Sequence, residues 1–552
     1  MIDFVCKYIP VEILAGFDEV CVRYNPMPDD ISLADNLAHS NMCSFSRSLI
    51  AARLQNSDRG LFLTNCCDSM RSANDALHNE GQTIFSLDLP HNSDHCGKLM
   101  YKNELLQFIA YFSDYSGRKF DCQKFRLAFE TTAEGISGPY IGVMGARLPD
   151  ELLAFIAEKS VLPICNNTCT GQRFFAQPPQ TDDLDQLMTW YADQLLTQTP
   201  CVRMTDISSR KVLVNDPNLK GIIYNTVSFC DFYGFEYAQL KKVLSVPMLK
   251  IETDYTHQAM AQMQTRLSTF FEGFEQPIQN EHRVTIYPES SAEQYTVGID
   301  SGSTSTNVVI LDGRQRLVSS CVIPTGARVT ESAQKSFGEA LKLAGLSEKQ
   351  ITGTVATGYG RAKINFRDKD VTEITCHAKG AHFLNPAVRT VIDIGGQDSK
   401  VIRLDETGTV IDFIMNDKCA AGTGRFLEMM AYSLGLGIQE MSIHGLQWHE
   451  EITISSMCSV FAQSEVVSLI AEEKNLEDII HGINMSVAAK VIALGKRSEM
   501  VGKYIMTGGV AKNRGVVKAL EAKLGQTIIV PDIPDICGAL GAALIAAHIQ
   551  EL

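Results

Sequence analysis

Three glycine-rich turns, each directly after an apolar run, constrain the second half of this 552-residue chain more than any other feature. They read VGIDSGSTST from Val297, VIDIGGQD from Val391 and YIMTGGVAKN from Tyr504. In the first two, an aspartate precedes the glycines and a second apolar run follows, at 308–311 and at 400–404. Such a hairpin presents backbone N–H groups and hydroxyls that can surround phosphate oxygens. The sequence therefore predicts two equivalent phosphate-binding turns and a third turn, at a helix start, that approaches an adenosine closely.

These turns supply a predicted set of nucleotide ligands. Asp300 and Asp393 are expected to hold Mg²⁺ through waters, because Mg²⁺ keeps much of its hydration shell. Gln397 is expected to orient the attacking water in phosphoryl transfer, and a turn-capping side chain is the alternative. The predicted cofactor-binding residues are Gly302, Ser303, Thr304, Gly395, Gly396, Gly422, Gly424, Gly508, Gly509 and Asn513.

The order and spacing of the three turns resemble the actin, sugar-kinase and Hsp70-type ATPase superfamily. One such turn alone is weak evidence for this superfamily, since many hairpins contain glycine. The resemblance implies an ATPase domain in which two pseudo-equivalent lobes face one ATP molecule.

The length of the chain predicts more than one domain, because one hydrophobic core does not grow to this size. Residues 275–294 are polar, lack helical periodicity and are interpreted as a linker between a domain of residues 1–274 and a domain of residues 295–552. The net charge of −15 argues against sequence-independent binding of nucleic acid, which needs a basic surface. No apolar run reaches the roughly 18 residues of a membrane span, and the N-terminus lacks a signal-peptide pattern. A cytoplasmic protein with no membrane partner is expected.

The first domain alternates short apolar runs with longer helical patterns, which is typical of a parallel α/β sheet, here in two Rossmann-like lobes. The predicted strands are 61–64, 83–87, 140–144, 221–227 and 247–251. Cys66 and Cys67 follow the first of these runs and Cys230 follows the fourth. Ligands of open α/β sheets bind beyond the carboxyl ends of the strands, whereas a core cysteine is a small buried hydrophobe. From the residues alone, a ligand role and a core role for these cysteines are equally supported.

The chain has 16 cysteines, eleven of them before residue 285. In a long chain without a secretory signal, reduced thiols that bind a metal or a cluster are favoured over disulfides. Cys419 and Cys458 each lie ahead of a predicted helix, whose free N–H groups and dipole stabilise a thiolate. A cubane needs four thiolates, and a two-fold dimer supplies four from these two. The sequence therefore predicts a homodimer with one shared [4Fe–4S] cluster.

Four runs in the second half resemble the activator ATPases of 2-hydroxyacyl-CoA dehydratases (BadF/BadG/BcrA/BcrD type), which are related to the ATPase subunits of benzoyl-CoA reductase. The runs are DIGGQDSK, NDKCAAGTGRFLE, SMCSVFAQSE and GGVAKN. The resemblance implies that Cys419 and Cys458 ligate the bridging cluster and that ATP turnover drives electron transfer. Asn307 departs from the pattern, because many relatives have lysine after the first phosphate turn.

The first half is similar to the D components of those dehydratases, and most similar to double-cubane cluster proteins. The resembling runs are CSFSRSL, NCCDSMR, CNNTCTGQR, PCVRMTDISSR and YNTVSFCDFYGFE. The resemblance implies cluster ligation by Cys43, Cys67, Cys96, Cys169, Cys201 and Cys230, with Cys66 and Cys165 as alternatives within the set. Six thiolates suit two cubanes that share a sulfide, whereas a simple dehydratase cluster needs about three. The sequence therefore does not decide whether the first domain holds one cubane or two.

Three functions follow from these patterns. The first is an ATP-dependent reductase of a small substrate, fed by an electron donor such as ferredoxin or flavodoxin. The second is a 2-hydroxyacyl-CoA dehydratase component fused to its activator, and the third is a metabolite kinase, in which Cys419 and Cys458 would have no role. Glu373 and His377, four positions apart on a predicted helix, are interpreted as an exposed local pair, with a nucleotide-sensing role as the alternative.

Overall fold

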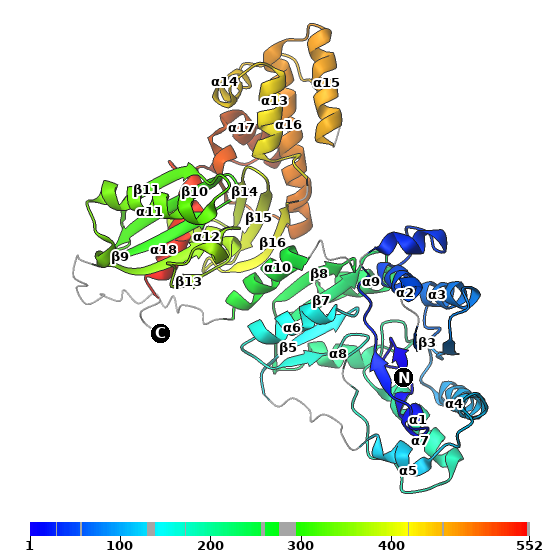
Figure 1. The fold of residues 1–552 in the computed structure, drawn as a ribbon. Helices are drawn as coiled ribbons and strands as arrows, with labels where there is room; N and C mark the ends of the chain where they lie inside the picture. The colour runs from blue at the N-terminus through cyan, green and yellow to red at the C-terminus, as the bar shows by residue number, and fades with distance from the viewer. Residues whose placement is uncertain are drawn as a thin grey trace. The chain divides into compact units, whose positions relative to one another are not determined.

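The computed structural model describes residues 1–28, 30–55, 58–129, 138–171, 173–255, 260–274, 294–417, 419–454 and 458–548. The chain divides into two compact units, Met1–Phe271 and Glu272–Leu552 (Figure 1). The predicted linker, residues 275–294, lies outside the described residues except for Gln294.

The N-terminal unit contains two four-stranded sheets, and every strand pair in them is parallel. The strands are β1 (Ile2–Phe4), β2 (Cys21–Arg23), β3 (Gly60–Thr64), β4 (Ile84–Leu87), β5 (Tyr140–Gly145), β6 (Ile164–Asn166), β7 (Leu219–Val227) and β8 (Met248–Thr253). The sheet orders are β2-β1-β3-β4 and β6-β5-β7-β8. Strands such as β5 and β7 are buried almost along their whole length, as expected for parallel strands covered on both faces. The predicted pair of parallel-sheet lobes is confirmed.

Helices connect these strands, and a single hydrophobic core includes residues of both sheets, such as Leu63 and Tyr224. The helices are α1 (Val11–Ala15), η1 (Ile31–Asn36), α2 (Ser44–Gln55), α3 (Asp68–Asn79), α4 (His95–Ser116), α5 (Cys122–Leu127), α6 (Asp150–Lys159), α7 (Leu184–Thr197), α8 (Ser208–Val214), α9 (Asp231–Leu240) and α10 (Met260–Glu272). The shared core fixes the two sheets of this unit against each other, so loops from both can line one site.

The C-terminal unit contains two five-stranded sheets built on the same plan. Their strands are β9 (Tyr295–Ser301), β10 (Ser305–Asp312), β11 (Leu317–Pro324), β12 (Ile351–Thr357), β13 (Lys369–Asp370), β14 (Thr390–Ile394), β15 (Ser399–Leu404), β16 (Val410–Asn416), β17 (Tyr504–Thr507) and β18 (Ile528–Ile529). The orders are β11-β10-β9-β12-β13 and β16-β15-β14-β17-β18. In each sheet three antiparallel strands are followed by two strands parallel to the first. This duplicated sheet confirms the predicted actin-type ATPase fold.

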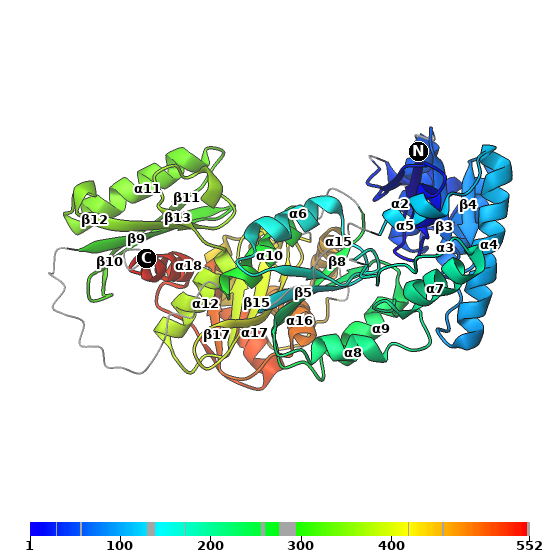
Figure 2. The ribbon, with the colours of Figure 1, turned by 90° about the horizontal axis from the view of Figure 1, so that it is seen from below.

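Eight α-helices among the described residues complete this unit. They are α11 (Val329–Ala344), α12 (Glu373–Leu384), α13 (Gly424–Ser433), α14 (Ile438–His444), α15 (Ser459–Ala471), α16 (Leu476–Gly495), α17 (Arg514–Leu524) and α18 (Cys537–Ala546). Helix α11 covers one face of the first sheet and α18 covers the other (Figure 2). Helices α12 and α18 touch backbone to backbone, because a Cβ atom at Gly541 would lie 1.8 Å from the Cys376 carbonyl oxygen.

Helices α13 to α17 pack around an apolar core that they share with strands of the second sheet, such as β14 and β17 (Figure 1). The segment Leu476–Ser498, which includes α16, is long and apolar enough to cross a membrane by length and composition alone. It has the burial of a core helix, since 61% of its most apolar window is buried within the unit. Ile480 and Val487, for example, are fully buried in this core.

Candidate functional site

Two buried aspartates face each other across His377 in the C-terminal unit. Asp300 is the penultimate residue of β9 and Asp393 is the penultimate residue of β14, and they are 7% and 3% exposed. His377 Nε2 lies 3.8 Å from Asp300 Oδ2, and His377 Nδ1 lies 3.5 Å from Asp393 Oδ1. Thr507 donates its hydroxyl to Asp393 Oδ1 at 2.8 Å. The duplicated sheet thus brings together the two aspartates that the sequence assigned to separate turns.

Lys400, which sequence reasoning did not single out, is a buried cation among three carboxylates. Its Nζ lies 2.7 Å from Asp398 Oδ2, 3.2 Å from Asp393 Oδ2 and 3.6 Å from Glu373 Oε1. Burial alone would lower the pKa of Lys400, but the three carboxylates raise it well above its ordinary value. Both Asp398 and Lys400 belong to the run DIGGQDSK, so their closeness to the second turn was visible in the sequence.

The interpretation of Glu373 and His377 as an exposed pair is wrong, because these side chains are only 6% and 5% exposed. Helix α12 turns them toward the aspartates from its buried face. Burial raises the pKa of Glu373 to about 7, although Lys400 opposes this shift. Polar residues on an otherwise apolar helix face were the available signal.

The two aspartates have opposite pKa shifts. Burial raises the pKa of Asp300; His377 opposes the shift and the Asp393 carboxylate adds to it. Burial would also raise the pKa of Asp393, but His377, Lys400 and the Thr507 hydroxyl stabilise its carboxylate and lower the pKa overall. A divalent cation beside Asp300 would relieve the burial of its charge, and carboxylates with waters are the ligands that Mg²⁺ prefers. The donor set therefore fits Mg²⁺.

The first two glycine turns are closed by their own backbones. The Gly302 N–H donates to the Ser305 carbonyl at 2.9 Å, and the Gly395 N–H donates to the Asp398 carbonyl at 3.0 Å. Each turn joins two antiparallel strands, β9 to β10 and β14 to β15. The equivalence that the sequence suggested therefore extends to their hydrogen bonds.

The tips of these two turns meet. A Cβ atom at Gly396 would lie 2.1 Å from Thr304 Oγ1, so only glycine allows this approach. Ser303 and Gln397 are exposed at the tips. The two turns that the sequence predicts to bind phosphate therefore lie next to each other.

The third turn lies directly against the second sheet. Gly508 has a φ of +81°, and a Cβ atom there would lie 2.4 Å from the Ile394 carbonyl oxygen. Gly509 follows, and Asn513 caps α17 by accepting the Val516 N–H at 3.2 Å. The Asn513 Nδ2 atom is buried and donates to no atom of the described residues. Asn513 therefore has a helix-capping role and a free amide donor.

The loop that carries Cys419 is hydrogen-bonded to the second phosphate turn. At the start of α13, the Gly424 N–H donates to the Gly395 carbonyl at 2.9 Å and the Arg425 N–H donates to the Gly396 carbonyl at 2.8 Å. Cys419 itself is exposed, five residues before α13. Displacement of the turn would therefore act directly on the helix behind this thiol.

Cys458 is exposed at the residue before α15, so its thiol lies at the N-terminus of that helix. Within the Cys419 loop, Gly422 has a φ of +88° and packs against Lys490. Burial lowers the pKa of Lys490, and Cys419 and Cys458 both oppose that shift. One ammonium group thus interacts with both thiols.

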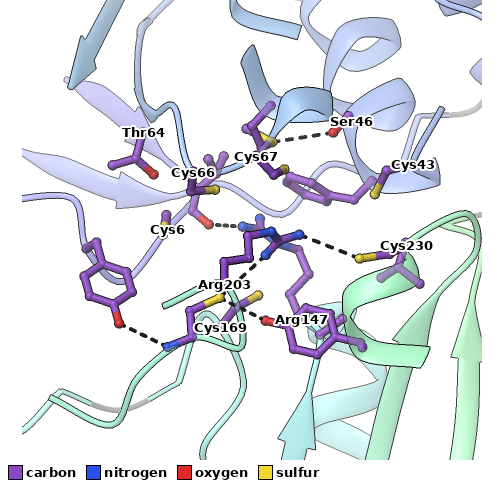
Figure 3. A pocket seen from close by; sticks show the side chains of 18 of the residues that line it. Cys6, Cys43, Ser46, Thr64, Cys66, Cys67, Arg147, Cys169, Arg203 and Cys230 are labelled. Carbon is purple, nitrogen blue, oxygen red and sulfur yellow. Dashed lines mark hydrogen bonds between the residues drawn. The ribbon is translucent and has the colours of Figure 1, made fainter. Parts of the chain in front are cut away.

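The N-terminal unit contains a pocket lined by seven cysteines (Figure 3). They are Cys6, Cys43, Cys66, Cys67, Cys169, Cys201 and Cys230. The empty volume, including the part open to solvent, is about 670 Å³. Several of these cysteines lie just beyond the carboxyl ends of strands of both sheets, such as Cys6 after β1 and Cys230 after β7. This placement is the one expected of a ligand site in an open α/β sheet.

Two pairs of pocket thiols shift each other's pKa. The neighbouring Cys230 thiol lowers the pKa of Cys43 below its ordinary value, against the opposing effect of burial. The neighbouring Cys66 thiol likewise lowers the pKa of Cys67, and Arg203 contributes to this shift. One thiol of each pair is therefore poised to be a thiolate, the form that binds metal.

Comparison with known proteins bears on both units. Residues 297–546 match the sequence profile of the BadF/BadG/BcrA/BcrD ATPase family, and residues 6–137 and 137–274 match that of the 2-hydroxyglutaryl-CoA dehydratase D-component. The chain is 45% identical over 255 residues to a 2-hydroxyisocaproyl-CoA dehydratase activator of Clostridioides difficile, an alignment of 46% of this chain and 94% of that protein. This chain belongs to the BadF/BadG/BcrA/BcrD ATPase family.

Further relatives match the same ATPase unit. The (R)-2-hydroxyglutaryl-CoA dehydratase activating ATPase of Acidaminococcus fermentans is 46% identical over 253 residues, which cover 46% of this chain and 96% of that protein. The crystal structure of component A of the Acidaminococcus fermentans dehydratase is 44% identical, with a TM-score of 0.46, and covers 47% of this chain and 99% of that chain. An ATPase unit of the family is thus joined here to a D-component-like unit.

Five of the six cysteines predicted in the N-terminal unit line the pocket, and Cys96 does not. Cys96 is exposed in the first turn of α4. Of the two alternatives, Cys66 lines the pocket, whereas Cys165 lies within β6 and accepts a hydrogen bond from Asn167 Nδ2 at 3.2 Å. Cys6 was missed, although it lies two residues after β1 and the strand-end rule could have found it.

The pocket fits a polynuclear iron–sulfur group better than a single metal ion. Among the described residues, no three Cys, His, Asp or Glu side chains are gathered tightly enough to hold one ion. Seven thiols spread around one pocket would suit a group with several metal atoms. Cys43, Cys66, Cys67, Cys169, Cys201 and Cys230 are the candidates to hold it, with Cys6 as a seventh.

Asn307, the predicted departure from the family pattern, lies on β10 next to the first phosphate turn. Its Nδ2 donates to the Asp535 carbonyl at 3.0 Å, and its Oδ1 is buried without a partner among the described residues. The amide therefore ties β10 to the segment before α18 and brings no positive charge to the turn.

Proposed function

We propose that this family member uses ATP hydrolysis to drive electrons from a [4Fe–4S] cluster, shared by two copies of the chain, into an iron–sulfur group in the cysteine pocket. The observation that carries the proposal is the pocket of seven cysteines in the same chain as the two adjacent phosphate turns. The named activators match the ATPase unit over nearly their whole length, so the electron acceptor would here be part of the same polypeptide. The reduced pocket would then reduce a small substrate.

The chemistry of this reaction indicates its electron donor, its compartment and the roles of the residues at the nucleotide. Electrons at low potential require a donor such as ferredoxin or flavodoxin, and exposed thiolate clusters require an oxygen-free compartment, which we take to be the cytoplasm. The cluster would supply electron transfer, while Asp300 and Asp393 would hold Mg²⁺ and Gln397 would orient the attacking water.

The exposed surface near Cys458 supports a homodimer. Val460, Phe461 and Val467 on α15 are 63%, 67% and 52% exposed. Large apolar side chains gathered on one helix favour burial against another protein surface. A second copy would cover them and bring its own Cys419 and Cys458, which completes a set of four thiolates.

The hydrogen bonds between the second phosphate turn and α13 give ATP a route to the shared cluster. Contacts of a γ-phosphate at Gly302, Ser303, Gly396 and Gln397 would hold the two turns together. Loss of those contacts on hydrolysis would move the Gly395 and Gly396 carbonyls, and with them the N–H groups of Gly424 and Arg425. ATP and ADP would then favour different positions of the Cys419 loop.

Arg425→Pro tests this route, because proline removes the N–H that bonds to Gly396 while the first turn of a helix tolerates proline. We expect ATP hydrolysis within about threefold of the wild type, but ATP-driven electron transfer reduced by about tenfold, the loss of roughly 1.4 kcal/mol of coupling. Arg425→Ala is the matched control, since it keeps the N–H and removes only an exposed side chain paired with Glu428. Equal electron transfer in both variants would contradict the route.

Iron and sulfide content decides between the proposal and a second candidate, a dehydratase component fused to its activator. That candidate is favoured by the match of residues 6–274 to the D-component profile. Anaerobically purified Cys419→Ser protein, which lacks the shared cluster, should hold about eight iron atoms per chain for a double cubane and about four for a dehydratase-like cluster. Cys165→Ser should hold as much pocket iron as the wild type, because Cys165 does not line the pocket. A chain without iron would refute both candidates.

A further inference from the structure

Arg203 is the basic side chain of the pocket that reaches sulfur. Its two terminal nitrogens donate to Cys201 Sγ and to Cys230 Sγ, each at 3.6 Å (Figure 3). These two thiols belong to different segments, one between α7 and α8 and the other at the start of α9. A single guanidinium thus bridges two candidate cluster ligands.

The other buried cations nearby use their donors on the backbone. Lys7 donates to the Thr199 carbonyl, and Arg147 donates to the Val5 carbonyl while its guanidinium lies 3.5 Å from the centre of the Phe45 ring. These contacts hold chain segments in place, and among the described residues neither side chain donates to a cysteine. Arg203 differs from both because its donors point at the ligands.

Arg203 also has one donor nitrogen without an acceptor. Its Nε atom is buried and has no hydrogen-bond partner among the described residues. The guanidinium is held beside the rings of Phe232 and Tyr233, 5.2 Å and 5.5 Å from their centres. A buried N–H without an acceptor costs free energy, and an acceptor bound in the pocket would recover it. The sulfur atoms of an iron–sulfur group are such acceptors.

We propose that Arg203 sets the reduction potential of the iron–sulfur group held in this pocket, an inference that rests on the proposed function. Reduction adds one negative charge to the group. A fixed cation and N–H···S hydrogen bonds stabilise that charge more in the reduced than in the oxidised state, and so raise the potential. Arginine keeps its proton at every working pH, so this contribution is constant. Arg203 thereby lowers the free energy that electron transfer into the pocket requires.

The test is a redox titration of the anaerobic full-length protein, followed by EPR of the pocket signal, which is the signal that persists in Cys419→Ser. Arg203→Met removes the charge and all three donor nitrogens, and Arg203→Lys keeps the charge but cannot bridge two sulfurs. At the wild-type midpoint, we expect the ratio of reduced to oxidised group to fall at least tenfold in Arg203→Met, a shift of about 59 mV for one electron. Arg203→Lys should lie between the two, and the control Arg147→Lys should stay close to the wild type.

Three outcomes would overturn the inference without touching the proposed function. The first is Arg203→Met protein with full iron content and an unchanged midpoint. The second is loss of iron from Arg203→Met with an unchanged midpoint in Arg203→Lys. The third is loss of iron from both variants, because Arg203 would then hold the group rather than tune it. A wild-type pocket that holds no iron would instead refute the proposed function itself.

Discussion

Serine in place of Cys419 or of Cys458 is expected to remove the shared [4Fe–4S] cluster completely and to shift the protein toward monomers. In a two-fold dimer each substitution deletes two of the four ligands at once, and a cubane held by two thiolates is not retained. Both thiols are exposed, so the substitutions disturb no core packing. The measurements are iron and sulfide per chain, the EPR spectrum and the sedimentation velocity of anaerobic protein.

Cys321→Ser is the matched control, because Cys321 lies on β11 in the same unit and packs, partly buried, against the core of the first sheet. It should keep the cluster and the dimer. If Cys419→Ser and Cys458→Ser also keep the iron content and the dimer of the wild type, the shared cluster does not exist.

Asp393→Asn is expected to reduce ATP hydrolysis by about 100-fold or more, the scale of removing one group that stabilises the transition state. Asp393 is the carboxylate that Lys400, His377 and Thr507 keep ionised, and asparagine keeps its shape without its charge. A proposed Mg²⁺ held through waters would lose one of its two anionic partners. Steady-state hydrolysis and nucleotide affinity, measured separately, distinguish a lost catalytic step from lost binding.

The control for this substitution is Asp312→Asn. Asp312 ends β10 in the same unit and pairs with Arg316 at the surface. Its substitution should leave hydrolysis unchanged, and full hydrolysis in Asp393→Asn would remove Asp393 from the catalytic machinery.

The sequence was sufficient for the architecture because periodicity and turn chemistry are local signals. The apolar–Asp–x–Gly form of the first two turns predicted a duplicated lobe, and β9 and β14 place Asp300 and Asp393 at equivalent positions. Alternation of strands and helices predicted the parallel sheets of the N-terminal unit in the same way.

The sequence was insufficient where tertiary packing decides exposure. The spacing of Glu373 and His377 fits a surface pair, but α12 packs against α18 and buries both beside the aspartates. The resemblance implied Cys96 as a cluster ligand, but Cys96 is exposed at the start of a helix. Cys6 was overlooked because it follows a strand of only three residues. Arg203 could not be placed from sequence, because its contacts join segments that the fold alone brings together.

The central claim, that ATP hydrolysis drives electrons from the shared cluster into the cysteine pocket, is tested most directly by one spectroscopic experiment. Anaerobic protein is treated with a reductant that reduces the shared cluster but not the pocket group, and Mg-ATP is then added. We predict that the EPR signal of the reduced pocket appears after Mg-ATP, does not appear after Mg-ADP, and forms much more slowly in Asp393→Asn and Gln397→Ala. Reduction of the pocket at the same rate without ATP would contradict the claim.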